Sequence, residues 1–313
     1  MKHFIIYPFI MKLTGKLTVL FLGILFFTHI TLRASDLSAD TVKILWVGSS
    51  STYCHDLPLQ SARALEGYFA PRPVMAYMVG RSGTGFHEYL QPDFEAQYGL
   101  KKGQTLLEKI KDEEYDYVVL QMITYFIGDH LKKETEESTD ILVKAIRESG
   151  AEPVYYEMGW RQGPENEVGR QLIAKSAQKN KIAYYAPCSS AWKQVRAEKS
   201  DLELHNLPDS DHPGTLGTYL NISCIYTAIA GEKMPAKSLN LEIWPRFGAF
   251  DKEAAAEKLT RTSLDDYHAD MPGWMQKISV MRSTVPIEKK TAKYLNRVAF
   301  ENWKLIKSNY NLP

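Results

Sequence analysis

Segments typical of β-strands alternate with segments typical of α-helices along most of this 313-residue chain, and this alternation restricts the fold more than any other feature. The strand-like segments are short and apolar; they cover residues 42–47, 74–79, 117–121, 153–157 and 181–186. The helix-like segments repeat apolar residues at helical spacing; they cover residues 57–69, 104–113, 134–149, 165–180 and 215–230. The order strand, helix, strand therefore recurs.

Strands joined through helices pair in parallel, by right-handed crossovers, and both faces of the resulting sheet are covered. We therefore predict an α/β fold, a three-layer flavodoxin-like sandwich with a central five-stranded parallel sheet. We assign residues 40–234 to this domain and residues 235–313 to a C-terminal helical extension packed on it. Ligands of such sheets bind outside the carboxyl ends of the strands.

The N-terminal residues 1–35 have the layout of a secretory signal peptide. Lys12 and Lys16 form a basic flank, and an apolar run at 17–27 follows. Such a run of roughly 7–15 residues suits a cleaved signal, whereas a membrane-spanning helix needs about 20. We expect cleavage between Ala34 and Ala39, a start at either Met1 or Met11, no stable membrane anchor after cleavage, and a secreted or periplasmic protein.

Charge and cysteine content argue against a nucleic-acid partner and a metal site. The chain has 38 Lys and Arg against 37 Asp and Glu, a formal net charge of +1 and no basic run, which argues against a nucleic-acid partner. Its three cysteines, Cys54, Cys188 and Cys224, allow at most one disulfide, whose pairing the sequence does not assign. We favour buried small side chains for them. No metal is expected, because these cysteines have no partner at zinc-ligand spacing.

Two segments bring serine and histidine chemistry to the predicted rim. The first strand runs into Gly48-Ser-Ser-Ser-Thr-Tyr53, a small-residue turn that can expose a hydroxyl above the sheet. Asp209 precedes His212 by three residues, shortly before the last helix of the domain. In a tight turn, an Asp so placed can orient the imidazole that a Ser nucleophile requires. Taken alone, the second segment is also typical of a helix N-cap turn.

These blocks together resemble the SGNH (GDSL-like) hydrolase family over residues 42–232, in particular a secreted bacterial branch. The blocks are 44–50, 80–90 and 209–213. The resemblance implies that Ser50 is the nucleophile, His212 the base and Asp209 its orienting carboxylate. It also implies that the backbone N–H groups of Ser50 and Gly83 stabilise the oxyanion.

Two departures from the family pattern concern the same region. Ser49 stands where the family has Asp or Asn, and Ile123 falls where an Asn donor is expected in a third block. Loss of one oxyanion donor can lower kcat roughly 10²–10³-fold. Gln121 or Tyr125 could donate instead, because each has a polar hydrogen.

Further residues are candidates for substrate contact. Trp160 and Arg161 follow the fourth strand, where a Trp can stack on a sugar and an Arg can bind a carboxylate or phosphate. A core Trp with a solvated Arg is an equal alternative. Trp192 is expected to pack in the core. We expect structural or surface roles for three nearby histidines, His55, His87 and His205.

The C-terminal stretch predicts helices at 251–264 and 274–281 and another that starts at Pro286. Apolar residues give this last helix one buried face; they are Leu295, Val298, Ala299, Leu305 and Ile306. A helical extension is the favoured interpretation, and a lid over the substrate is the alternative. The lid would use aromatic and basic side chains, namely Trp244, Arg246, Phe247 and Trp274.

The functional hypothesis is a serine esterase that hydrolyses an acyl ester through a Ser-His-Asp triad and an acyl-enzyme, without metal or organic cofactor. Export and family resemblance suggest a small-molecule or glycan ester, such as an O-acetyl group on a carbohydrate. An acyltransferase with the same triad is one alternative. A catalytically impaired carbohydrate-binding protein is another, and Ile123 is its best support. The sequence does not predict an oligomeric state.

Overall fold

The computed structural model describes residues 41–96, 99–123, 129–159, 164–206, 209–236, 240–243 and 283–313, and within them the side chains of all but 129–134, 164–165 and 209–211. The predicted signal peptide therefore lies outside the described residues. The described residues from Val42 onward belong to one unit. No helix among the described residues is long and apolar enough to cross a membrane.

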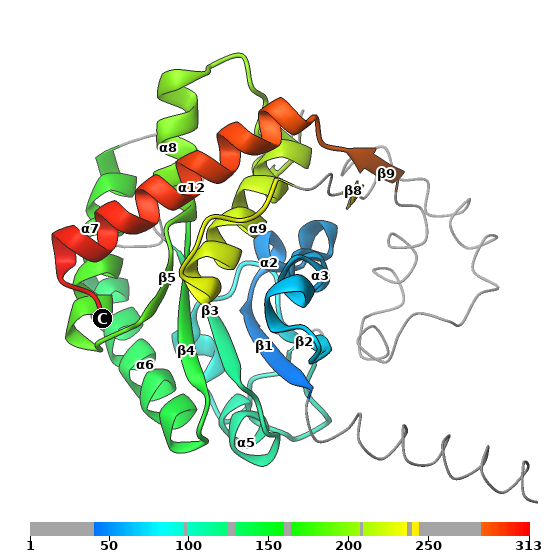
Figure 1. Cartoon of the computed structure of the whole chain (residues 1–313). Helices are drawn as coiled ribbons and strands as arrows, with labels where there is room; N and C mark the ends of the chain where they lie inside the picture. Colours follow the sequence, from blue (N-terminus) through cyan, green and yellow to red (C-terminus); the bar gives the residue numbers. More distant parts are fainter. Residues whose placement is uncertain are drawn as a thin grey trace, which may run out of the picture. The chain divides into compact units, whose positions relative to one another are not determined.

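A five-stranded parallel sheet lies at the centre of this unit (Figure 1). Its strand order is β2-β1-β3-β4-β5, the order of flavodoxin-like sheets. The strands are β1 (Val42–Gly48), β2 (Val74–Gly80), β3 (Tyr117–Ile123), β4 (Glu152–Met158) and β5 (Tyr184–Ala186). The predicted fold class is therefore confirmed. Strand β5 is shorter than predicted.

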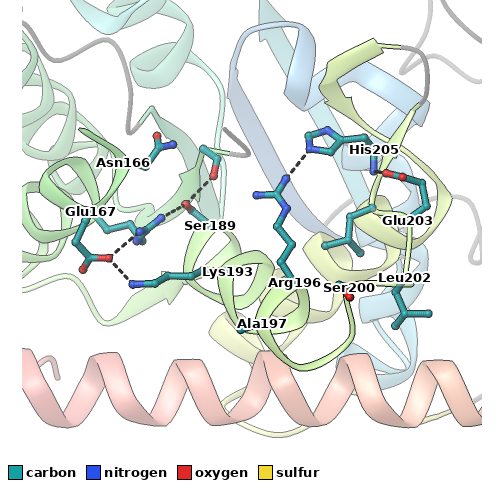
Figure 2. Close-up of a pocket in the computed structure, with 13 residues that line it drawn as sticks. Asn166, Glu167, Ser189, Lys193, Arg196, Ala197, Ser200, Leu202, Glu203 and His205 are labelled. Carbon is teal, nitrogen blue, oxygen red and sulfur yellow. Dashed lines mark hydrogen bonds and ion pairs between the residues drawn. The ribbon is translucent and has the colours of Figure 1, made fainter. Parts of the chain in front are cut away.

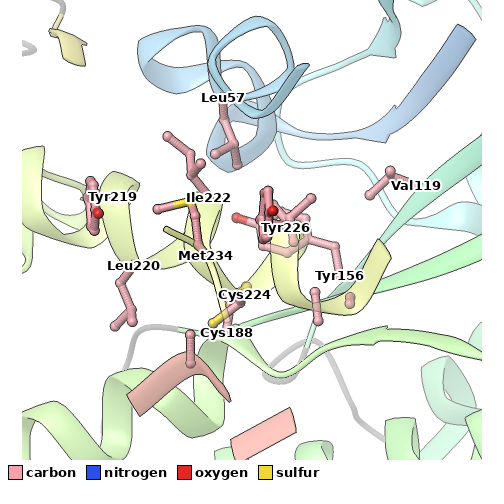
Figure 3. Close-up of a cluster of buried hydrophobic side chains, with 14 of the residues drawn as sticks. Leu57, Val119, Tyr156, Cys188, Tyr219, Leu220, Ile222, Cys224, Tyr226 and Met234 are labelled. Carbon is pink, nitrogen blue, oxygen red and sulfur yellow. The ribbon is translucent and has the colours of Figure 1, made fainter. Parts of the chain in front are cut away.

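Helices cover both faces of the sheet, because successive side chains of a strand point to opposite faces. Ile44 and Trp46 belong to one hydrophobic cluster, and Leu45 and Val47 belong to the other. The first cluster (Figure 3) packs against α3 (Leu57–Phe69), α8 (Cys188–Glu198), α9 (Thr215–Ala230) and α12 (Lys289–Tyr310). The second packs against α5 (Leu106–Asp112), α6 (Asp129–Glu148) and α7 (Pro164–Lys179).

Helix α8 and the segment after it differ from the sequence-based expectation. Helix α8 was not predicted, although Ala191, Trp192 and Val195 give it a buried face. Asp209–Pro213 forms strand β7, which pairs antiparallel with β6 (His205–Asn206). The pairing is irregular: Asn206 lies opposite Asp209 and His205 lies opposite Pro213, so the chain bulges over residues 210–212. The pair continues as a bond from Gly214 N to Leu204 O at 2.7 Å.

The C-terminal part adds a second small sheet and one long helix. Strand β8 (Asn240–Ile243) pairs antiparallel with β9 (Ser283–Pro286), so Pro286 ends a strand and the helix α12 starts three residues later, at Lys289. Helix α12 packs on α9 and α8. The helices expected at 251–264 and 274–281 and the proposed lid residues lie outside the described residues.

The predicted buried face of α12 is correct except at one position. Leu295, Val298 and Ala299 are buried, and Ile306 packs against the second cluster. Leu305 is 55% exposed. Neighbouring helical residues differ by about 100° around the axis, so Leu305 points away from the face that Ile306 presents.

Candidate active site

Ser50 and His212 meet above the end of strand β1. Ser50 is the first residue of the short helix α2 (Ser50–Tyr53), which follows β1 directly, and His212 lies in β7. The His212 Nε2 atom is 2.9 Å from Ser50 Oγ. Both residues are half-buried, whereas Ser51, Thr52 and Tyr53 are buried. An imidazole at this distance can accept the hydroxyl proton, and a half-buried hydroxyl can reach a substrate.

The turn that holds Ser50 is fixed from beneath by Gln121 at the end of β3. Ser49 N donates to Gln121 Oε1 at 2.7 Å, and Gln121 Nε2 donates to Ser49 Oγ at 2.8 Å. Thr52 Oγ1 also donates to Gln121 Oε1. Gln121 is only 3% exposed. Ser49, directly after β1, is therefore bonded in both directions to Gln121 in β3.

Gly48 permits this close approach. A Cβ atom at this position would overlap Thr52 Oγ1 and Gln121 Oε1, so only glycine leaves room for the amide. The Gly48 carbonyl accepts a hydrogen bond from the buried Tyr89 hydroxyl at 2.7 Å. Burial raises the pKa of Tyr89, so its hydroxyl stays protonated and donates. The strand end below Ser50 is thus held by two neighbouring elements, β3 and the helix α4 (Phe86–Tyr89).

A second histidine connects the Ser50 turn to the strand of His212. His55 lies in the 3-10 helix η1 (Cys54–Asp56), is completely buried, and has a left-handed φ of 56°. Its Nε2 atom lies 2.9 Å from the carbonyl of Pro213 and donates to it. Burial lowers the pKa of His55 to about 4; the hydrogen bond to Pro213 O opposes this shift, and the neighbouring His212 adds a little to it. His55 is therefore neutral at neutral pH and confirms the expected structural role.

Gly83 lies in the loop between β2 and α4, next to helix α2. It is exposed and has a φ of 65°, which favours glycine. The neighbouring Ser82 hydroxyl hydrogen-bonds the hydroxyl of Tyr53 in α2. This bond connects the loop of Gly83 to the helix of Ser50.

Several predicted site residues are placed only in part. The backbone of Asp209 belongs to β7, but its side chain lies outside the described residues, as do Tyr125, Trp160 and Arg161. Ile123 ends β3 and packs partly against the first cluster. Gln121, expected as an oxyanion donor, is instead bonded to Ser49.

The remaining expectations concern core residues and metals. Trp192 is buried, and its Nε1 donates to Asn221 Oδ1 at 2.9 Å, so its predicted packing role is confirmed. The three cysteines are buried and unbridged, as favoured. Cys188 and Cys224 lie next to each other in the first cluster (Figure 3). Among the described residues, no group of three His, Cys, Asp or Glu side chains could hold a metal ion.

Sequence reasoning missed the link between Gln121 and Ser49 and the anchoring bond of His55. No local pattern signals either contact, because the paired residues lie 72 and 158 positions apart.

Comparison with known proteins identifies similar structures but no family. No family model matches the sequence, and no curated protein matches it significantly. One similar structure is a carbohydrate esterase family 3 from Talaromyces cellulolyticus, at 15% identity and a TM-score of 0.45, over 61% of this chain and 97% of the other. Another is a gut microbial diltiazem-metabolizing enzyme, at 13% identity and a TM-score of 0.42, over 60% of this chain and 47% of the other.

Proposed function

We propose that this chain is a serine esterase of the SGNH type. The observation that carries the proposal is the 2.9 Å contact between His212 Nε2 and Ser50 Oγ at a half-buried position. Ser50 Oγ attacks the ester carbonyl while His212 accepts its proton. His212 then returns the proton to the leaving alcohol, and the acyl group remains on Ser50. Water, deprotonated by His212, releases the acid and regenerates the serine.

The negative charge that develops on the carbonyl oxygen needs hydrogen-bond donors. In our proposal, the backbone N–H groups of Ser50 and Gly83 supply them. Asp209 orients His212 through its other ring nitrogen. Gln121 holds the turn through Ser49, so the family's Asp or Asn is replaced by a bonded pair rather than simply lost.

The substrate we propose is an acyl ester on a small molecule or a glycan, such as an O-acetyl sugar. A protein exported through residues 1–35 to the periplasm or the medium would meet such esters. The carbohydrate-binding alternative needs no activated serine. The Ser50–His212 contact therefore favours the esterase over that alternative.

Intact mass after treatment with a fluorophosphonate tests the nucleophile, because this probe requires an activated serine but little substrate specificity. We expect one adduct, located on Ser50 and absent from Ser50→Ala. A serine elsewhere in the chain provides the matched control, and Ser149→Ala should label like the wild type. Folded protein without an adduct at Ser50 would contradict the esterase and favour a binding protein.

A further inference from the structure

A cavity of about 800 Å³ opens beside the sheet, between α7, α8 and the chain that leads into β6 (Figure 2). Its lining is largely polar and charged, with Asn166, Arg170, Ser189 and Lys193 on the helical side. Pockets for small ligands have volumes of roughly 300–1,000 Å³. The cavity is therefore large enough for one or two sugar rings.

The cavity belongs to the same rim of the sheet as Ser50. Gly159 directly follows β4, and Ser189 lies in the first turn of α8, which follows β5, so both line the cavity at the carboxyl ends of strands. On the opposite wall, His205 pairs across the β6–β7 ladder with Pro213. Pro213 is the residue after His212, so the cavity wall and the proposed base share one strand pair.

Positive charge exceeds negative charge in the cavity. Arg170 Nη2 and Lys193 Nζ both contact Glu167 Oε2, at 2.8 and 2.6 Å. One carboxylate thus serves two cations. Glu203 is the other acid of the lining, and its Oε1 accepts the backbone N–H of His205 at 2.8 Å.

Arg196 differs from these two cations because it makes no close ion pair, and Glu203 acts on it only as a nearby negative charge. Its guanidinium stacks over the Trp192 ring at 5.2 Å, and its Nη2 lies 2.5 Å from His205 Nε2. Among the described residues, no carboxylate forms an ion pair with Arg196. A half-buried cation of this kind is costly unless an anion accompanies it. A guanidinium offers five donors, so most of them remain available to a ligand.

We propose that this cavity is an anion subsite that binds the carboxylate or sulfate of an acidic sugar carrying the ester. Arg196 is its central donor, and Lys193 and Arg170 add positive charge. The proposal deepens the proposed function and rests on it for the identity of the ester-bearing substrate. The binding step itself does not require catalysis, so it can be tested separately.

Calorimetric titration of the Ser50→Ala protein tests the subsite. The probes are digalacturonate for a carboxylate, N-acetyllactosamine 6-sulfate for a sulfate, and lactose as the neutral sugar. We expect at least one anionic sugar to bind, with an affinity that falls as salt rises, and lactose to bind at least tenfold more weakly. No binding of either anionic sugar, or equal binding of lactose, would overturn the proposal.

Variants of the cavity locate the binding. Arg196→Met keeps the stem over Trp192 and should raise Kd roughly tenfold or more, because charge-assisted hydrogen bonds are lost. Lys193→Met, at a side chain 63% exposed, cannot disturb the core and should weaken binding less. Lys179→Met removes a cation that pairs with Asp140 outside the cavity, so it should leave binding and esterase activity unchanged.

Unchanged Kd in folded Arg196→Met and Lys193→Met would overturn the proposal. Fluorophosphonate labelling of the wild type reports separately on Ser50. Labelling without anion binding would therefore leave the esterase intact and reject the subsite. Anion binding without labelling of Ser50 would support the subsite and contradict the esterase.

Discussion

Two regions at the same edge of the sheet differ in how far their polar side chains bond to one another. Below Ser50, the Gln121 amide bonds to Ser49 and Thr52, and the Tyr89 hydroxyl bonds to Gly48 O. At the ends of β4 and β5, a cavity contains three cations but only two carboxylates. Both regions lie at the carboxyl ends of strands, where parallel sheets place their ligands.

The difference distinguishes positioning from binding. Buried polar groups that bond to one another hold a single geometry, which a reacting serine needs. A cation that makes no close ion pair, such as Arg196, leaves hydrogen-bond donors for a ligand. We therefore expect the polar groups around a nucleophile to form hydrogen bonds with one another. At a ligand subsite, we expect some donors to remain available to the ligand.

The largest expected effect is loss of the base. His212→Gln should lower kcat for 4-nitrophenyl acetate by on the order of 10⁴-fold, because Ser50 then has no group to accept its proton. Initial rates and the fluorophosphonate labelling rate check this, with circular dichroism as the control for folding. A variant that keeps a tenth of the wild-type rate would remove His212 from the mechanism.

The anchoring histidine should produce an acid-dependent loss of stability. The pKa of buried His55 is about 4, against an ordinary value of 6.5. Above pH 6.5 the residue is neutral in both the folded and unfolded states. As pH falls toward 4, only the unfolded state binds the proton, so the free energy of unfolding should drop by up to about 3 kcal/mol.

Urea unfolding at a series of pH values measures that drop. His55→Gln keeps a donor for the Pro213 carbonyl but does not titrate, so its stability should vary less between pH 6.5 and 4. Equal slopes for the two proteins would show that other groups cause the acid sensitivity.

Gln121 should act on the rate rather than on substrate binding. Gln121→Met removes the bonds to Ser49 and Thr52 and should lower kcat by about 10²-fold through misplacement of Ser50, with little change in KM. Gln121→Glu still accepts from Ser49 N and should retain more of the rate. If Gln121 donated directly to the oxyanion, Gln121→Glu would lower kcat as much as Gln121→Met, because neither side chain has an amide N–H.

The smallest expected effect is the loss of stability on substitution of Glu167 in the cavity. Hydrogen bonds from Arg170 and Lys193 lower the pKa of Glu167 to about 2. Lys193 and Glu167 are both partly exposed, so Glu167→Gln should lower the free energy of unfolding in urea by less than about 1 kcal/mol. It also frees two cations, so anionic sugars should bind more tightly. Weaker binding would show that Glu167 positions these cations rather than neutralises them.

Most of the fold could be predicted from periodicity. Helices α3 and α9 begin and end at the residues predicted, because their apolar faces and flanking glycine or proline signal both ends. Helix α8 was missed, since its apolar residues Ala191, Trp192 and Val195 form a short pattern inside polar sequence. Strand β7 was missed as well, because it pairs with His205–Asn206 only on either side of a bulge and has no alternating apolar pattern.

The candidate site was predictable only at its chemically distinctive residues. Ser50 and His212 stand in recognisable blocks, and the structure brings their side chains together. Neither the Gln121 contact with Ser49 nor the Arg196 cavity has a local signal. Both depend on which distant strands and helices become neighbours.

The sequence by itself determined the layered α/β architecture, the strand ends at which chemistry would gather, and the serine and histidine to examine. These follow from hydrophobic periodicity and residue type, which are local properties. The tertiary structure alone decided that Gln121 holds the turn, that His55 connects it to the strand of His212, and that Arg196 lines a cavity in which cations outnumber carboxylates. Hydrogen bonds and charge balance depend on distances of a few ångströms between residues far apart in the chain, and only packing sets those distances.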